Sequence, residues 1–162
     1  MKRKIIFMAL AATIGLSSCS QSKDSKATTE TKQHNAKQVK EKKMKVTELT
    51  AEVFKKQVMD YETHPNEWVF AGERPAVIDF YATWCGPCKA TAPVIDELVD
   101  VYDGKVDFYK IDVDKQQELA ALFGVRSIPS LLFVPKTGKP SMQVGAMNRQ
   151  QLEDAIKNTL LK

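Results

Sequence analysis

The order of hydrophobic and polar positions divides the chain into three parts. Residues 5–16 form a single apolar run, residues 20–45 contain only Val39 and Met44 as sizeable apolar side chains, and dense apolar patterning follows. A segment with so little apolar surface cannot offset the entropy lost on folding, so we expect residues 20–45 to be disordered. The pattern therefore predicts one folded domain at residues 46–162.

Strands and helices alternate along the first part of this domain. A nearly continuous apolar run at 76–82 is typical of a fully buried strand, and Thr50 is a suitable N-cap for a helix with an apolar face. Residues 59–75 show neither pattern and are expected to be a long irregular connection. The remaining pattern predicts a helix at 89–102 interrupted by Pro93, a strand at 106–114, a helix at 116–124 ended by Gly124, strands at 130–135 and 140–146 joined by a turn, and a helix after Asn148. This order predicts an α/β fold in which helices cover both faces of a mixed β-sheet.

The first 45 residues have the pattern of an export signal followed by a tether. Basic residues at 2–4 precede the apolar run, which at twelve residues is shorter than the roughly 20 residues that span a bilayer as a helix. The run ends in "LSSC" (16–19), which resembles the bacterial lipoprotein box. The resemblance implies a signal peptide at 1–18, lipid attached to Cys19 after cleavage, and a lipidated, lysine-rich tether at 19–45. The alternative is an ordinary secretory signal in which Cys19 is incidental.

The net charge of +4 is unevenly distributed along the chain. Residues 20–45 carry eight lysines against three acidic residues, whereas residues 46–162 carry a net charge of −4. The basic character of the whole chain therefore comes from its first part and is no argument for nucleic-acid binding. The tether lysines either contact anionic lipid headgroups or are simply solvated.

Cys85 and Cys88 stand directly after the buried strand, at the start of a predicted helix. A structural zinc site needs four ligands, and the two histidines, His34 and His64, are isolated, so we predict no metal site. With Cys19 assigned to lipid, the two cysteines are left with each other. A disulfide that closes so short a loop stabilises a fold by only about 1–2 kcal/mol, so a purely structural role is a weak explanation.

Redox chemistry explains the position of the pair better. A cysteine at a helix N-terminus faces unpaired backbone N–H groups and the positive end of the helix dipole, both of which favour the thiolate. We therefore expect Cys85 to attack a substrate disulfide and Cys88, one turn further along the helix, to resolve the mixed disulfide. Pro87 costs little in a first helical turn, where its missing N–H has no partner. An exported protein lies in an oxidising compartment, in which such a pair can serve redox work.

The segment "VIDFYATWCGPCKATAPVIDEL" (77–98) resembles the active-site segment of thioredoxin, and CGPC is the signature of that family. The similarity continues through "KIDVD", "FGVRSIPSLLFV" and "VGAMNRQQL" and covers residues 70–162. It implies a thioredoxin fold and thiol–disulfide exchange with no cofactor other than the redox-active Cys85–Cys88 disulfide. The 41-residue spacing from Cys88 to Pro129 leaves no room for the helical insertion of periplasmic disulfide oxidases.

The resemblance also implies roles for residues around the cysteines. Asp79 is an acid inside an apolar strand, so we expect a raised pKa or a charged partner, unless the side chain turns to solvent at a strand edge. The resemblance implies that Asp79 accepts the proton of Cys88 and that Lys110, unless it is an ordinary surface lysine, lies near Asp79. It also implies a cis peptide bond before Pro129 and a flat apolar surface for the substrate chain, made of Trp84, Gly86, Pro87, Ile128, Pro129, Gly145 and Ala146; Trp84 is alternatively a core residue. The family pattern is not followed at Tyr81, at Thr83 and in the longer segment 60–75.

These features predict a protein-disulfide reductase that is exported, anchored to a membrane by lipid and facing the periplasm. Its expected partners are disulfide-bearing exported proteins and a membrane thiol–disulfide relay that supplies electrons, and we expect a monomer. The Gly-Pro dipeptide accompanies reducing relatives, so we expect a Cys85 thiol pKa of about 7 and a potential close to the value of about −270 mV for thioredoxin. Two alternatives stay open: a disulfide oxidase or isomerase in oxidative folding, and a thioredoxin-fold binding module without turnover.

Overall fold

A five-stranded mixed β-sheet lies at the centre of residues 46–162, the part of the chain that the computed structural model describes. The strands are β1 (Thr47–Glu48), β2 (Ala76–Tyr81), β3 (Asp107–Asp112), β4 (Ser130–Val134) and β5 (Ser141–Val144), in the spatial order β1-β3-β2-β4-β5. β3 is parallel to both β1 and β2, whereas β4 is antiparallel to β2 and β5 is antiparallel to β4. The predicted signal peptide, Cys19 and tether lie outside the described residues.

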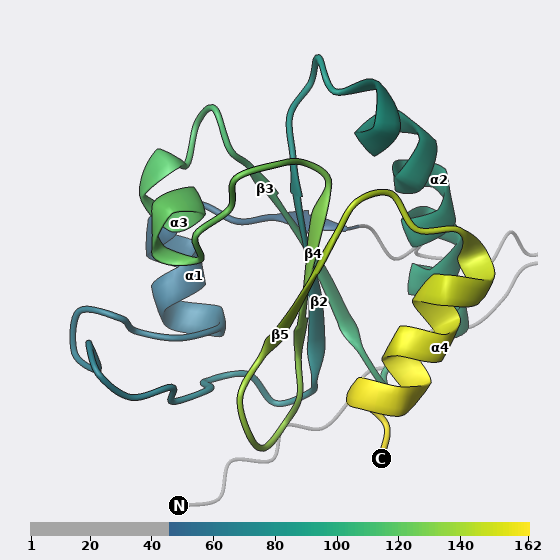
Figure 1. Cartoon of the computed structure of the whole chain (residues 1–162). Helices are drawn as coiled ribbons and strands as arrows, with labels where there is room; N and C mark the ends of the chain where they lie inside the picture. The colour runs from purple at the N-terminus through teal and green to yellow at the C-terminus, as the bar shows by residue number, and fades with distance from the viewer. Residues whose placement is uncertain (1–45) are drawn as a thin grey trace, which may run out of the picture. The chain divides into compact units, whose positions relative to one another are not determined.

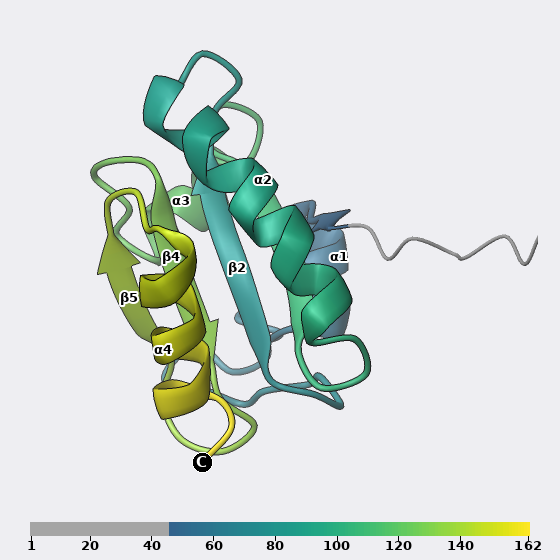
Figure 2. The ribbon, with the colours of Figure 1, turned by 90° about the vertical axis from the view of Figure 1, so that its right-hand side faces the viewer.

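Helices cover both faces of this sheet, so the predicted α/β architecture is confirmed (Figure 1). The helices α1 (Ala51–Gln57) and α3 (Gln117–Leu122) lie on one face, and α2 (Gly86–Val101) and α4 (Arg149–Thr159) lie on the other. Figure 2 shows α2 and α4 in front of the sheet. An ion pair of 2.7 Å between Glu97 of α2 and Arg149 of α4 joins the two helices. None of the helices at residues 46–162 is long and apolar enough to cross a membrane.

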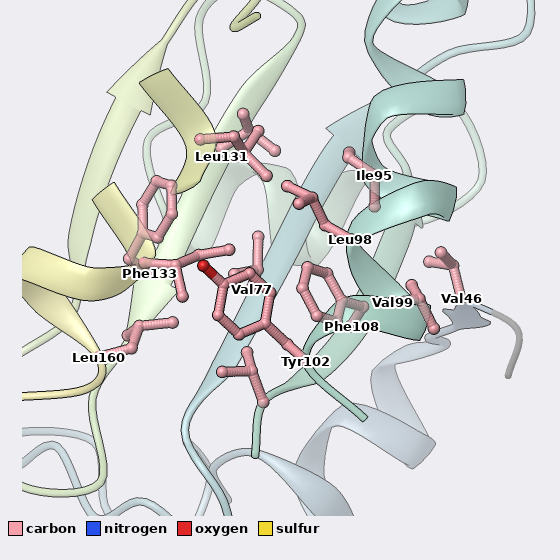
Figure 3. Close-up of a cluster of buried hydrophobic side chains, with 13 residues drawn as sticks. Val46, Val77, Ile95, Leu98, Val99, Tyr102, Phe108, Leu131, Phe133 and Leu160 are labelled. Atoms are coloured by element: carbon pink, nitrogen blue, oxygen red, sulfur yellow. The ribbon is translucent and has the colours of Figure 1, made fainter. Parts of the chain in front are cut away.

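Alternation along the buried strands sends neighbouring side chains to opposite faces of the sheet. In β2, Val77 packs beneath α2 and α4, whereas Ile78 packs against α1 and α3. Figure 3 shows the first of these two clusters, in which Ile95 and Leu98 of α2 point toward the sheet. Because Asp79 follows Val77 by two positions, its side chain belongs to the same face as α2.

Local sequence signals locate several helix ends closely. Thr50 caps α1 by accepting a hydrogen bond from the N–H of Val53, and Asn148 caps α4 in a reciprocal capping box with Gln151. Gly124 follows α3 with φ of +60°, the left-handed conformation that glycine adopts without strain.

The predicted interruption of α2 at Pro93 is wrong. The helix runs from Gly86 to Val101 with Pro93 inside it. Pro93 removes one backbone hydrogen bond, but Ile95 and Leu98 anchor the later turns in the core, and this packing outweighs the loss.

The long segment between α1 and β2 contains no helix or strand, as the sequence predicts, and it covers the core on the α1 side. The N–H of Ala71 donates to the carbonyl of Val58 at 2.8 Å, which brings the end of the segment back to α1. The Trp68 ring packs edge-on against Phe123, with ring centres 6.2 Å apart. This segment therefore covers aromatic side chains on this face of the sheet.

Candidate active site

Cys85 and Cys88 form a disulfide at the N-terminus of α2. Cys85 is the N-cap residue: its Sγ accepts a hydrogen bond from the N–H of Cys88 at 3.1 Å, and its carbonyl accepts one from the N–H of Lys89 at 3.2 Å. The two Cα atoms are 5.3 Å apart, and each cysteine is only 3% exposed. Because N–H groups at a helix N-terminus stabilise negative charge, this position favours a thiolate at Cys85 once the disulfide is reduced.

A short connection places the disulfide beside the carboxyl end of the central strand. β2 ends at Tyr81, and the N–H of Cys85 donates to the carbonyl of Ala82 at 3.2 Å. Pro87 lies in the first turn of α2, where its missing N–H leaves no hydrogen bond unmade. The sequence thus passes from a buried strand to a reactive helix start within a few residues.

Trp84 lies at the surface beside the disulfide and is not a core residue. Its side chain is 68% exposed, and its indole N–H donates to Oδ2 of Asp114 at 2.8 Å. Asp114 comes shortly after β3, whose carboxyl end lies next to that of β2 because the two strands are parallel. This hydrogen bond holds the indole in place over the surface that surrounds the cysteines.

Asp79 is buried in β2, on the face that α2 covers. It is 5% exposed, so it does not turn to solvent, and its Oδ1 is enclosed without a hydrogen-bond partner among the described residues. Burial raises the pKa of the Asp79 carboxyl to about 7, and the positive charge of Lys110 acts against this shift. A carboxyl with such a pKa both accepts and releases a proton near neutral pH.

A pocket of about 280 Å³ joins Asp79 to Cys88, and Lys110 and Tyr81 are also among its lining residues. A second pocket, of about 170 Å³, reaches Asp79 and Lys110 from the side of Asp96. Lys110 lies directly opposite Asp79 in the register of β2 and β3. Both pockets exceed the share of about 30 Å³ that one water molecule takes in the liquid, so they give protons a route between Asp79 and solvent.

The loop before β4 and the loop after β5 meet near the disulfide. The peptide bond between Ile128 and Pro129 is cis, and Ile128 packs against the cluster that contains Cys85 and Cys88. The carbonyl of Pro129 accepts a hydrogen bond from the N–H of Gly145 at 2.8 Å. Gly145 has φ of +105°, a conformation that a residue with a Cβ rarely adopts.

The strand directions bring all the predicted substrate-binding residues to one end of the sheet. This end carries the carboxyl ends of β2, β3 and β5 and the amino end of β4. The residues concerned follow β2 (Trp84, Gly86, Pro87), precede β4 (Ile128, Pro129) or follow β5 (Gly145, Ala146). Trp84, Gly86, Pro87 and Ala146 are exposed, whereas Pro129 is buried.

Sequence reasoning did not identify Asp114 as the partner of Trp84, nor the contact between Tyr81 and Lys110. A signal for Asp114 was present, since an acid after one parallel strand lies near residues that follow its neighbour. Within residues 46–162, no group of three or more His, Cys, Asp and Glu side chains is placed to hold a metal ion. His64 belongs to the segment between α1 and β2, and His34 lies outside the described residues.

The fold and the site together define a thiol–disulfide oxidoreductase. The family model of thioredoxin matches residues 45–158, and the chain belongs to the thioredoxin family. It is 46% identical over 110 residues to the thioredoxin of Borreliella burgdorferi, an alignment that covers 68% of this chain and 93% of that protein. It is 34% identical over 113 residues to thioredoxin 1 of a Nostoc species, with coverage of 70% and 95%.

Among solved structures, chloroplastic thioredoxin z has the same fold, with a TM-score of 0.58 at 23% identity and coverage of 72% of this chain and 95% of that one. Members of the family are disulfide reductases of proteins and need no cofactor beyond their redox-active cysteines. This chain is accordingly a disulfide reductase, and Cys85 and Cys88 are the only cysteines at residues 46–162. The hypothesis of a binding module without turnover is not supported.

Proposed function

We propose that this chain is a lipid-anchored protein-disulfide reductase that acts outside the cytoplasm. The proposal rests on two features that occur together in this chain, one at the active site and one in the N-terminal sequence. A buried Asp79 shares a pocket with Cys88, the disulfide partner of Cys85, and the N-terminal segment has the pattern of a lipoprotein signal. The family assignment gives the fold and the reductase activity, whereas the cellular location of the protein and the roles of individual residues are proposed here in addition.

The reaction consists of two thiol–disulfide exchanges. The Cys85 thiolate of the reduced protein attacks one sulfur of a substrate disulfide, so that a mixed disulfide forms and one substrate thiolate leaves. The Cys88 thiolate then attacks Sγ of Cys85, so that the Cys85–Cys88 disulfide forms and the second substrate thiolate leaves. Two electrons pass from the cysteine pair to the substrate, whose two thiolates take up protons.

Asp79 accepts the proton that Cys88 loses before the second exchange. The two residues line the same pocket, and burial raises the pKa of the Asp79 carboxyl to about 7. A general base works best when its pKa lies near the working pH, because it is then ionised in part and still basic enough to take the proton. The proton leaves Asp79 through the solvent that enters the pocket beside Lys110.

A substrate segment binds across the exposed surface around the cysteines. Trp84 and Pro87 offer exposed apolar area beside the disulfide, and Ile128, which precedes cis-Pro129, packs against the cysteine cluster. Because Cys85 and Cys88 are each only 3% exposed, a substrate sulfur reaches them only when its chain lies against this surface. The site therefore favours disulfides in accessible or unfolded segments.

The N-terminal sequence supports the location. We assign residues 1–18 to a signal peptide, Cys19 to lipid attachment, residues 19–45 to a tether and residues 46–162 to the thioredoxin domain, which faces the periplasm as a monomer. A domain in this location is separated from reductases driven by cytoplasmic NADPH. Its electron donor is therefore a membrane thiol–disulfide relay.

Substrate trapping tests the residue roles. In a strain that produces the full chain, Cys88→Ser should accumulate exported proteins in mixed disulfides with Cys85, and dithiothreitol should release them. The double variant Cys85→Ser/Cys88→Ser is the matched control and should trap none. Equal recovery from the two variants would show that Cys85 is not the nucleophile.

Mass spectrometry of the mature N-terminus tests the location. We expect cleavage before Cys19 and acyl chains on that residue, and we expect Cys19→Ser to release the protein from the membrane fraction. More than one chain is expected, because a single acyl chain anchors only marginally. Cleavage at another position, or an unmodified Cys19, would show that the anchor is absent.

A further inference from the structure

Lys110 is not paired with the acid that it faces. It lies opposite Asp79 in the register of β2 and β3, and both side chains line the same two pockets. No ion pair joins them among the ion pairs of residues 46–162. The Lys110 ammonium instead lies over the ring of Tyr81, with Nζ 5.2 Å from the ring centre.

Tyr81 is placed so that its ring and the Asp79 carboxylate compete for one ammonium. The two residues are two positions apart in β2, so they share the face that α2 covers, and Lys110 lies opposite Asp79 on the neighbouring strand with its ammonium over the Tyr81 ring. The face of an aromatic ring attracts a cation, and the attraction increases when solvent is partly excluded. The carboxyl group of Asp79 attracts the same cation strongly only when it is ionised.

We propose that Tyr81 is a positioning residue for the acid–base step: its ring holds the Lys110 ammonium out of a direct ion pair with Asp79, and so keeps that carboxyl able to take a proton from Cys88. This inference rests on the role proposed above for Asp79. A direct ion pair with Lys110 would stabilise the carboxylate and make Asp79 a weaker base. The ring thus preserves the proton affinity that burial gives to Asp79.

The other charged groups near Asp79 do not provide this control. From α2, Lys89 and Asp96 line the pockets, but both side chains are exposed, so solvent screens their charges. Their charges are also of opposite sign, so their effects on Asp79 oppose each other. From β4, the residue opposite Asp79 is Leu131, which carries no charge.

The hydroxyl of Tyr81 takes no part as a base. Burial, together with the negative charges of Glu48 and Asp112, raises the pKa of Tyr81 above its ordinary value. Lys115 acts in the opposite direction but pairs with Asp112 at 3.2 Å. The hydroxyl therefore stays protonated near neutral pH, and the effect on Lys110 belongs to the ring.

Carboxyl titration tests this inference directly. The Asp79 pKa is measured by ¹³C NMR in the oxidised full chain and in Tyr81→Leu, which removes the aromatic face but keeps an apolar side chain. We expect the Asp79 pKa to fall by about half a pH unit, because the ammonium no longer has the ring as an alternative to the carboxylate. Tyr81→Phe keeps the ring and should keep the wild-type value.

A second pair of variants shows whether the effect passes through Lys110. In a Lys110→Met background, Tyr81→Leu should no longer lower the Asp79 pKa. An unchanged or raised pKa in Tyr81→Leu would overturn the proposal, and so would an equal fall in Tyr81→Phe or a fall that persists without Lys110. Tyr81→Met replaces Tyr81→Leu if the amide spectrum shows that the latter is unfolded.

The rate of the second exchange is then measured against pH in the same variants. A shift of the acid limb to lower pH in Tyr81→Leu supports both the positioning role of Tyr81 and the role of Asp79. If the carboxyl pKa falls while the rate profile does not move, Tyr81 still positions Lys110, and the proposed role of Asp79 as proton acceptor is wrong.

Discussion

Replacing Asp79 by asparagine should stabilise the folded protein above neutral pH and leave its stability nearly unchanged in acid. Burial raises the pKa of this carboxyl in the folded state to about 7, from an ordinary value of 3.8. Between these two values the folded state holds a proton that the unfolded state has already lost. The free energy of unfolding therefore falls as the pH rises through this window, because the folded state binds more protons than the unfolded state.

The size of the effect follows from the same shift. A pKa raised from 3.8 to about 7 corresponds to about 4 kcal/mol of unfolding free energy that is present below pH 4 and lost above pH 7. Because Asp79 is 5% exposed, solvent screens this penalty little. Asparagine has nearly the same shape and no charge, so Asp79→Asn should gain up to about 4 kcal/mol over the wild type at pH 8.5 and almost nothing at pH 4.

Urea unfolding of the oxidised protein at pH 4, 6 and 8.5 measures this difference. Asp96→Asn is the matched control, since Asp96 lines the second pocket but is exposed, and it should leave the pH dependence as it is in the wild type. The reasoning is refuted if Asp79→Asn is no more stable than the wild type at pH 8.5. It is equally refuted if the gain is the same at pH 4, because a gain without pH dependence does not come from ionisation.

Three other outcomes test the direction of electron flow and the packing of the fold. Equilibration with glutathione should give a midpoint redox potential close to the value of about −270 mV known for thioredoxin, since Gly-Pro adds no charge beside Cys85. A midpoint potential above about −180 mV, in the range of disulfide isomerases, would contradict the direction of electron flow expected of a reductase. Phe54→Ala should lower the free energy of unfolding by about 3–5 kcal/mol in urea, because Phe54 is fully buried and packs on Phe123. Asn148→Ala should cost about 1 kcal/mol in thermal unfolding by removing the cap of α4, whereas Asn148→Ser should retain most of the stability.

Features that depend on neighbours in the sequence could be predicted closely. The run at 76–82 forms the central strand, Asn148 caps the last helix, and Gly124 ends α3, because burial of a strand and the satisfaction of helix ends are set within a few residues. The position of Cys85 at a helix start belongs to the same class. Burial of Asp79 was expected from its apolar flanks, because the residues on either side of it in the strand belong to the core.

Features that depend on strand register could not be predicted in this way. β1 has only two residues, both exposed, and exists because Thr47 lies opposite Tyr109 of β3. The position of Lys110 over the Tyr81 ring requires the parallel register of β2 and β3, which no local pattern specifies. The error at Pro93 has a related cause, since contacts with the sheet maintain α2 where local propensity would end it.

Both edges of the sheet are short. β1 has two residues and β5 has four, while the longer strands β2, β3 and β4 lie inside. A sheet edge presents unpaired N–H and C=O groups to which any extended polypeptide can add as a further strand, and long edges are sites of aggregation. A reductase of proteins repeatedly meets extended chain segments with exposed apolar groups. With so little edge available, such a segment finds only a few main-chain hydrogen-bond partners on the sheet. It can therefore dissociate once its disulfide has been reduced, and it does not accumulate on the reductase as added strands.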